Sequence, residues 1–193
     1  MYEPLRKSIA SKVEFTEEEY EQLIKCLKYK TIRKGEFLLN SGDVCKYGIF
    51  VLSGCLSYSI IDDNNEEKII DLGTEGWWMG DAKSFFGGTT SPYTIKALTD
   101  SEVLLNDVKS ALAIINKYHF YLKYHYFALL EYRDRTDSLL LHSLNLQAEE
   151  KYRYIMATRP TLFQEILLQY IASFIGVTPS SLSRIRRKFK DLY

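Results

Sequence analysis

The sequence predicts an α+β protein: an N-terminal antiparallel β-roll, one long helix, and a C-terminal helix-turn-helix. Three observations lead to this prediction. Seven glycines between residues 35 and 80 divide the chain into short runs rich in β-branched and aromatic residues, a pattern typical of strands joined by turns. From about residue 107 the apolar residues recur at helical spacing. The last 43 residues are basic, whereas the first 150 are acidic. Strands followed only by helices are typical of α+β folds.

A short amphipathic helix is expected over residues 15–28. Its apolar residues are spaced at close to helical intervals, and Thr16 followed three residues later by Glu19 predicts a capping box. After this helix the runs 47–54, 55–61 and 67–73 are expected to be antiparallel strands, with the sequence DDNN forming a tight turn before the third. A compact β-roll over residues 1–118 is the predicted result.

The segment 119–145 contains neither glycine nor proline, and it is expected to form one continuous helix. At 1.5 Å per residue this helix would be about 40 Å long. A helix of that length on a small domain usually packs against something large, and a second copy of the chain is the expected partner. Residues 119–145 are therefore predicted to be a dimerisation helix, followed by a helix-turn-helix domain over residues 146–193.

The charge of the chain is unevenly distributed. Residues 1–150 hold 17 Lys and Arg against 23 Asp and Glu, whereas residues 151–193 hold 8 Lys and Arg against 2 Asp and Glu. A basic segment on an acidic body points to double-stranded DNA as a partner. A basic face that only contacts solvent is the alternative that charge alone leaves open.

The stretch from residue 170 to residue 188 has the features of two helices joined by a tight turn. Ala172 is small where a second helix must cross closely, and Gly176 can leave the first helix in the left-handed conformation. Thr178 is a natural N-cap and Pro179 a natural first residue of the next helix. Two helices joined in this way form the unit that reads DNA in many proteins.

On the second helix Leu182 and Ile185 are expected to point inward. Arg184 can reach a guanine edge, and the other basic residues, Lys190 among them, can neutralise phosphates. The candidate DNA-binding residues are Thr178, Ser180, Ser181, Ser183, Arg184, Arg187 and Lys188.

Several functional classes are not expected. Cys26, Cys45 and Cys55 have no CxxC spacing and are interpreted as structural thiols, and the three histidines all lie after the strand-rich region. No metal site, cofactor or catalytic residue is therefore predicted, and the chain is not expected to be an enzyme. The sequence also lacks an apolar membrane span or signal segment, so a cytoplasmic protein is expected.

With these residues in view, the chain resembles the CRP/FNR family of bacterial transcription regulators over nearly its whole length. The resemblance rests on KGEFLLNSGD (34–43), IFVLSG (49–54), GWWMGD (76–81) and, most specifically, YIASFIGVTPSSLSRIRRK (170–188). It implies a cyclic-nucleotide-binding-like effector roll, a homodimer joined along the long helix, and binding to a palindromic operator. RNA polymerase is the further partner that the resemblance implies.

The effector pocket that the resemblance implies comprises Trp78, Gly80, Asp81, Ser91, Pro92, Tyr93 and Thr94. Cyclic-AMP-binding relatives hold the cyclic phosphate with an arginine, and no arginine occurs between Arg33 and Arg133. A buried phosphate without a cation is costly, so cyclic AMP binding is not expected. Two alternatives stay open: the pocket takes another ligand of apolar character, or the nearby aromatic residues Trp77, Trp78, Phe85 and Phe86 are simply core.

Two further departures concern the DNA-reading helix. Ser180 stands where relatives commonly have a glutamate, so a different operator is expected. The sequence ends at Tyr193, where relatives usually continue into a β-hairpin wing, so either a short or absent wing or a truncated chain is expected. These departures leave one alternative function open, a ligand-binding or protein-interaction module with lost or weak DNA binding.

Overall fold

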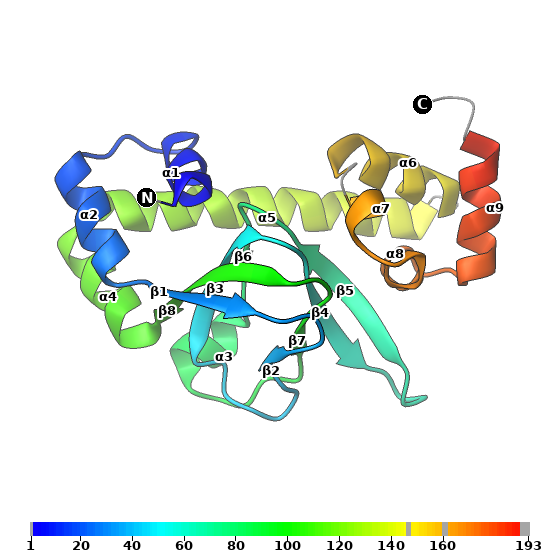
Figure 1. The fold of residues 1–193 in the computed structure, drawn as a ribbon, viewed down its shortest axis with the longest axis horizontal. Coiled ribbons are helices and arrows are strands. Elements are labelled where there is room, and N and C mark those ends of the chain that lie inside the picture. The colour runs from blue at the N-terminus through cyan, green and yellow to red at the C-terminus, as the bar shows by residue number, and fades with distance from the viewer. Residues whose placement is uncertain (1, 146–147, 160–161, 190–193) are drawn as a thin grey trace. The chain divides into compact units, whose positions relative to one another are not determined.

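The computed structural model describes residues 2–145, 148–159 and 162–189, and the chain forms two compact units, residues 1–130 and 131–193. The first unit contains two four-stranded antiparallel sheets (Figure 1), with strand orders β1-β8-β3-β6 and β2-β7-β4-β5. The strands are β1 (Lys28–Ile32), β2 (Phe37–Leu39), β3 (Tyr47–Ser53), β4 (Leu56–Ile61), β5 (Glu67–Gly73), β6 (Trp78–Met79), β7 (Thr94–Ala97) and β8 (Ser101–Asp107). The predicted antiparallel roll is confirmed.

The turn between β4 and β5 forms as its sequence predicts. Asp62 accepts hydrogen bonds at its carboxylate from the N–H groups of Asn64 and Glu66, both at 2.9 Å. Asn65 has a positive φ of 61°, which asparagine tolerates better than most residues. The two strands then pair antiparallel, with Ile61 opposite Glu67.

The step from β3 to β4 differs from the expected tight turn between paired strands, because the two strands belong to different sheets. Gly54 lies at this corner with φ +86°, and a Cβ atom there would be 2.6 Å from the carbonyl oxygen of Asp100. The close approach of the loop before β8 therefore requires glycine at this position.

Alternate side chains of strand β3 lie in two different hydrophobic clusters, one on each face of its sheet. Ile49 and Val51 lie in the cluster inside the roll, whereas Phe50 and Leu52 lie in a second cluster on the opposite face. This alternation follows from the two-residue period of a strand. The inner cluster also includes Cys45, and burial raises the pKa of its thiol. Cys26, Cys45 and Cys55 are all free thiols.

Helices cover the outer face of this sheet, and their apolar residues complete the second cluster. These helices are α1 (Glu3–Ala10), α2 (Glu17–Lys25), α4 (Val108–Lys117) and the first part of α5 (His119–Asn145); α3 (Ala82–Gly87) lies between β6 and β7 in sequence. The long helix that the sequence predicts over residues 119–145 is confirmed.

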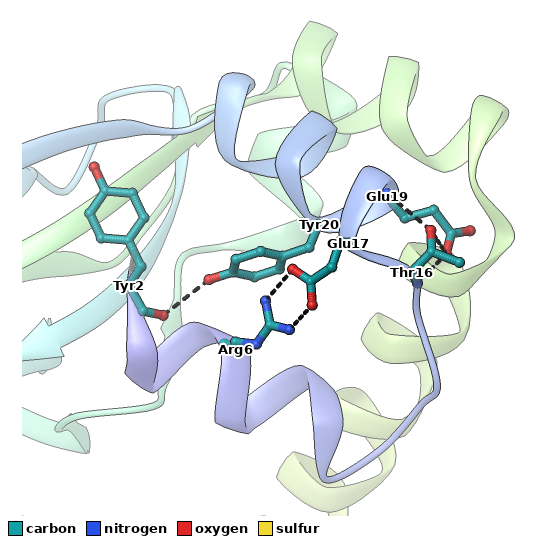
Figure 2. A network of polar contacts seen from close by, with 6 residues as sticks. All are labelled: Tyr2, Arg6, Thr16, Glu17, Glu19 and Tyr20. Carbon is teal, nitrogen blue, oxygen red and sulfur yellow. Dashed lines mark hydrogen bonds and ion pairs between the residues drawn. The ribbon is translucent and has the colours of Figure 1, made fainter.

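Figure 2 shows how α1 is attached to α2. Arg6 forms a bidentate ion pair with Glu17, and the hydroxyl of Tyr20 donates to the backbone carbonyl of Tyr2 at 3.1 Å. The predicted capping box is confirmed: the N–H of Glu19 donates to Thr16 Oγ1, and the N–H of Thr16 donates to the carboxylate of Glu19. The sequence reading missed α1, which buries only Leu5 and Ile9.

The second unit is helical over its described residues and contains the end of α5 followed by α6 (Ala148–Thr158), α7 (Leu162–Glu165), α8 (Leu168–Ile175) and α9 (Pro179–Phe189). Its centre is aromatic: the ring of Tyr152 stacks on Phe189 with centroids 5.9 Å apart and meets Phe163 edge-on at 5.1 Å. Ile155 and Leu162 are buried beside them. None of the helices in the described ranges has the length and hydropathy needed to cross a membrane.

Candidate nucleic-acid interface and ligand cavity

The turn between α8 and α9 has the geometry that its residues predict. Gly176 adopts the left-handed conformation with φ +85° and ψ 35°, and its N–H donates to the carbonyl of Ala172 at 2.9 Å. Thr178 caps α9, because the N–H of Ser181 donates to Thr178 Oγ1 at 3.2 Å. Pro179 is the first helical residue, where its missing N–H has no intrahelical partner to lose.

The inner faces of the two helices are also as predicted. Ala172 is fully buried on α8, and Leu182, Ile185 and Phe189 are buried on α9. Burying these side chains leaves one side of α9 in solvent. The exposed residues on and before α9 are Thr178, Pro179, Ser180, Ser183, Arg184, Arg186, Arg187 and Lys188.

The candidate DNA-binding residues therefore fall into three groups. Ser180, Ser183, Arg184 and Arg187 are exposed. Thr178 and Ser181 form the helix cap, and the Arg184 guanidinium reaches back to Ser181 Oγ at 3.4 Å.

Lys188 forms the third group, because it is paired within the second unit. Its Nζ lies 2.8 Å from each carboxylate oxygen of Glu149 on α6. Lys190 and the segment in which a wing is expected lie outside the described residues.

Several polar groups of the predicted effector-pocket residues already make hydrogen bonds within the protein. Asp81 caps α3, with its carboxylate accepting from the N–H groups of Lys83 and Ser84. Ser91 is buried, and its carbonyl accepts from the N–H of Gly42 at 2.7 Å.

The rest of that segment packs against the roll. The ring of Tyr93 stacks on Tyr58 with centroids 4.5 Å apart, and Thr94 Oγ1 accepts from the N–H of Ser41 at 3.3 Å. Pro92 is exposed. Lys96, a cation that could meet a phosphate, lies over the Phe37 ring at 5.1 Å.

A cavity of about 440 Å³ lies in the first unit between the roll and the first half of α5. Of the predicted pocket residues, Trp78 and Gly80 line it, whereas Asp81, Ser91, Pro92, Tyr93 and Thr94 do not. Its lining residues are Tyr47, Gly48, Trp78, Met79, Gly80, Ala82, Phe85, Phe86, Asn106, Ala111, Ile115, Tyr121, Leu122, His125, Tyr126 and Leu129.

Sequence reasoning missed the polar residues of this cavity. Asn106 is the last residue but one of β8. Its Nδ2 donates to the hydroxyl of Tyr121 at 2.9 Å, while its buried Oδ1 has no hydrogen-bond partner among the described residues. An unpaired buried acceptor costs about 1–3 kcal/mol. No local signal marks Asn106, because its contacts come from a helix later in the chain.

His125 is the second missed residue. The sequence places it on the long helix, outside the strand-rich region, but its ring lies 5.1 Å from Trp78 and 4.4 Å from Tyr121. Burial lowers the pKa of His125 to about 4, so the imidazole is neutral near pH 7. Within the described residues, no group of three or more His, Cys, Asp or Glu is arranged to hold a metal ion.

Comparisons with known proteins agree with this architecture. Residues 29–118 match the family model of the cyclic nucleotide-binding domain. No curated protein is recognisably similar to the chain in sequence. Among solved structures, FixK2 from Bradyrhizobium japonicum has a TM-score of 0.75 at 13% identity, with 86% of this chain and 85% of that chain covered.

Two further structures are similar over most of the chain. The regulator CLP of Xanthomonas campestris, described as responsive to c-di-GMP, has a TM-score of 0.68 at 14% identity, covering 91% of this chain and 92% of that one. The Thermus thermophilus catabolite activator protein has a TM-score of 0.58 at 20% identity, covering 92% and 84%. The chain therefore has the fold of these CRP/FNR-type structures, and its residues 29–118 match the cyclic nucleotide-binding domain model.

Proposed function

We propose that this protein is a homodimeric, cytoplasmic transcription regulator that binds a palindromic DNA operator through α9. The observation that carries the proposal is the division of α9 into a buried apolar side and an exposed side with Ser180, Ser183, Arg184 and Arg187. The regulator fold supports it. RNA polymerase is the further partner in this proposal.

In this proposal the N-terminal end of α9 enters the major groove. Its first backbone N–H groups and the hydroxyl of Ser180 can approach phosphates and base edges. Arg184, one turn further along, can donate two hydrogen bonds to the edge of a guanine. Arg187 contacts phosphates and contributes affinity that does not depend on sequence.

Dimerisation is assigned to the long helix. Several large apolar side chains on the described part of α5 are exposed, and Leu129 is 63% exposed. Exposed apolar patches of this kind usually mark an interface. The exposed apolar residues of this helix are Leu122, Tyr126, Phe127, Leu129, Leu130 and Tyr132. For two copies of α9 to enter successive major grooves, they must stand about 34 Å apart.

In this proposal each of three consecutive segments of the chain has its own role. Residues 1–118 form the effector domain, residues 119–145 the dimerisation helix, and residues 146–193 the DNA-binding domain. The boundary between the two compact units falls within α5, after residue 130. The effector is not cyclic AMP in this proposal, because no arginine lies between Arg33 and Arg133 to hold its phosphate.

The deciding experiment is DNA-site selection from a random library, followed by mobility-shift titration at several salt concentrations. Arg184→Ala should weaken binding to the selected site by roughly tenfold or more and reduce discrimination at one base pair. Arg187→Ala should weaken binding to all sequences and lower the salt slope by about 1.

The matched control is Lys46→Ala, which removes one exposed positive charge from the roll. It should leave both the affinity and the salt slope unchanged. If Arg184→Ala and Arg187→Ala behaved like this control, α9 would not be the DNA-contacting helix.

A further inference from the structure

The C-terminal end of α8 needs donors for its last carbonyl groups, because a helix leaves these groups without intrahelical partners. The turn supplies some of them: the N–H groups of Gly176 and Val177 both donate to the carbonyl of Ala172, at 2.9 Å. The carbonyl of Ile175, the last residue of α8, accepts from another helix. Lys151 on α6 donates to it from Nζ at 3.1 Å. A lysine 24 residues earlier in the chain therefore caps α8.

The ammonium group of Lys151 lies against the turn itself. The side chain is half-buried, and a Cβ atom built on Gly176 would be 3.9 Å from Lys151 Nζ. A cation at this end of a helix interacts favourably with the partial negative charge of the last carbonyls. A hydrogen bond from a charged donor is also stronger than one between neutral groups. Lys151 is thus directed at the turn between α8 and α9, whereas Arg184 and Arg187 on α9 are exposed.

Helix α6 also contacts the opposite end of α9. The ring of Tyr152 stacks on Phe189, the last described residue of α9, with centroids 5.9 Å apart. The 11 residues of α9 span about 16 Å, so this contact is far from the first turn of the helix. The contact of Lys151 with Ile175 lies close to that first turn, just before the N-cap Thr178. Helix α6 therefore holds α9 near both of its ends.

We propose that Lys151 is a positioning residue: it does not contact DNA, but it sets the specificity of α9 by fixing the turn from which α9 begins. This proposal rests on the function proposed above. The bidentate contact of Arg184 with a guanine requires a defined position and direction, whereas contacts with phosphates depend mainly on charge. A displaced first turn of α9 therefore weakens recognition of the selected site more than binding to unrelated sequences.

The test compares two substitutions of Lys151 in mobility-shift titrations of the full-length protein. Lys151→Met keeps an apolar stem and removes the charged donor. Its affinity for the selected site should fall roughly fivefold, while its affinity for unrelated sequences and its salt slope should equal those of the wild type. The ratio of the two affinities is measured on one sample, so it does not depend on the folded fraction. Lys151→Arg retains a charged donor and should restore this ratio.

Two further variants give the patterns expected of other roles. Arg187→Ala removes a proposed phosphate contact, so it should weaken binding to all sequences and lower the salt slope by about 1. Lys46→Met removes an exposed charge from the roll and should change neither quantity. The proposal is overturned if Lys151→Met follows either pattern, because Lys151 would then contact phosphate or have no role in DNA reading. Failure of Lys151→Arg to restore the ratio would also overturn it.

Amide hydrogen exchange tests the cap without DNA. In Lys151→Met the amides of Gly176 and Val177 should exchange roughly fivefold faster. Those of α6 should not change, because the substitution leaves its backbone hydrogen bonds intact. Unchanged exchange at the turn would refute the cap. A wild-type protein that selects no DNA but shows this exchange pattern would refute the proposed function alone. Normal DNA selection with unaltered discrimination in Lys151→Met would refute the positioning role alone.

Discussion

Lys188 on α9 donates hydrogen bonds to both carboxylate oxygens of Glu149 on α6, with Nζ 2.8 Å from each. The pair is partly exposed, so its contribution to stability is small, about 0–1 kcal/mol. Its effect on the proposed DNA binding should be larger, because a phosphate near Lys188 must compete with a fixed carboxylate.

Glu149→Gln should therefore strengthen DNA binding. Removing the carboxylate frees Lys188 and removes one negative charge beside the proposed interface, so affinity for all sequences should rise several-fold at low salt. Mobility-shift titrations measure the change. Glu150→Gln is the charge-matched control, because Glu150 pairs with Arg153 on its own helix, at 3.9 Å. Equal effects of the two changes would mean that Lys188 is not the residue released.

Thr178→Ala should destabilise the start of α9 by about 1 kcal/mol, because it removes the side-chain acceptor for the N–H of Ser181. Amide hydrogen exchange of the first turn of α9 is the measurement, and its protection should fall about fivefold or more. Thr178→Ser retains the hydroxyl and should protect these amides nearly as well as the wild type. Comparable exchange in both variants would argue against the cap.

Gly54→Ala should destabilise the roll by more than the backbone strain of an alanine at positive φ alone. At φ +86° the backbone strain costs about 1–2 kcal/mol, and the new Cβ would also collide with the loop at Asp100 and Ser101. Gly42→Ala has the same strain at φ +90° but meets nothing within 4 Å. Urea unfolding should show a further loss of about 1–3 kcal/mol for Gly54→Ala, and matching losses would contradict the close approach.

The free energy of unfolding should depend on pH through the titration of His125. The pKa of His125 in the folded protein is about 4, below its ordinary value of 6.5, so the unfolded chain takes up the proton first as the pH falls. The free energy of unfolding is therefore unaffected above about pH 6.5 and decreases as the pH falls from 6.5 towards 4.

Urea midpoints measured at pH 7 and pH 5 test this dependence. His125→Gln should show a smaller loss between the two pH values than the wild type. His119→Gln, at an exposed position at the start of α5, should lose as much as the wild type. A loss in His125→Gln equal to that of the wild type would show that His125 does not titrate in this range.

Phe127→Glu should weaken the proposed dimer, because Phe127 is 44% exposed on α5 and does not line the cavity. Burying a carboxylate in an apolar interface is costly, so the dimer dissociation constant should rise at least tenfold. Analytical ultracentrifugation measures it. Lys123→Glu, an exposed change one turn earlier on the same helix, should have a smaller effect. An unchanged dimer in Phe127→Glu would place the interface elsewhere.

Structural features that depend on residues three or four apart in the chain could be predicted from the sequence. The Thr16–Glu19 capping box, the DDNN turn and the Gly176, Thr178 and Pro179 junction each depend on backbone groups close in the chain. Their physical causes, a free N–H group to satisfy or a positive φ to accommodate, are local. The inward positions of Leu182 and Ile185 followed from helical spacing in the same way.

Contacts between segments that are far apart in the chain could not be predicted from the sequence. The separation of β3 and β4 into different sheets depends on β8, which pairs with β3 from about fifty residues later in the chain. The same holds for the cavity, where Asn106 contacts Tyr121, and His125 contacts Trp78, only because α5 packs on the roll.

The sequence by itself thus determined the order of strands, long helix and helix-turn-helix, the acidic and basic halves, and the polar and apolar sides of α9, because each depends on composition or on short-range periodicity. Only the tertiary structure decided which side chains are free to act. It paired Lys188 with Glu149, used the Asp81 carboxylate to cap α3, and buried Asn106 Oδ1 without a hydrogen-bond partner among the described residues. These outcomes depend on which elements pack together, and burial and pairing are properties of the packed chain rather than of any one segment.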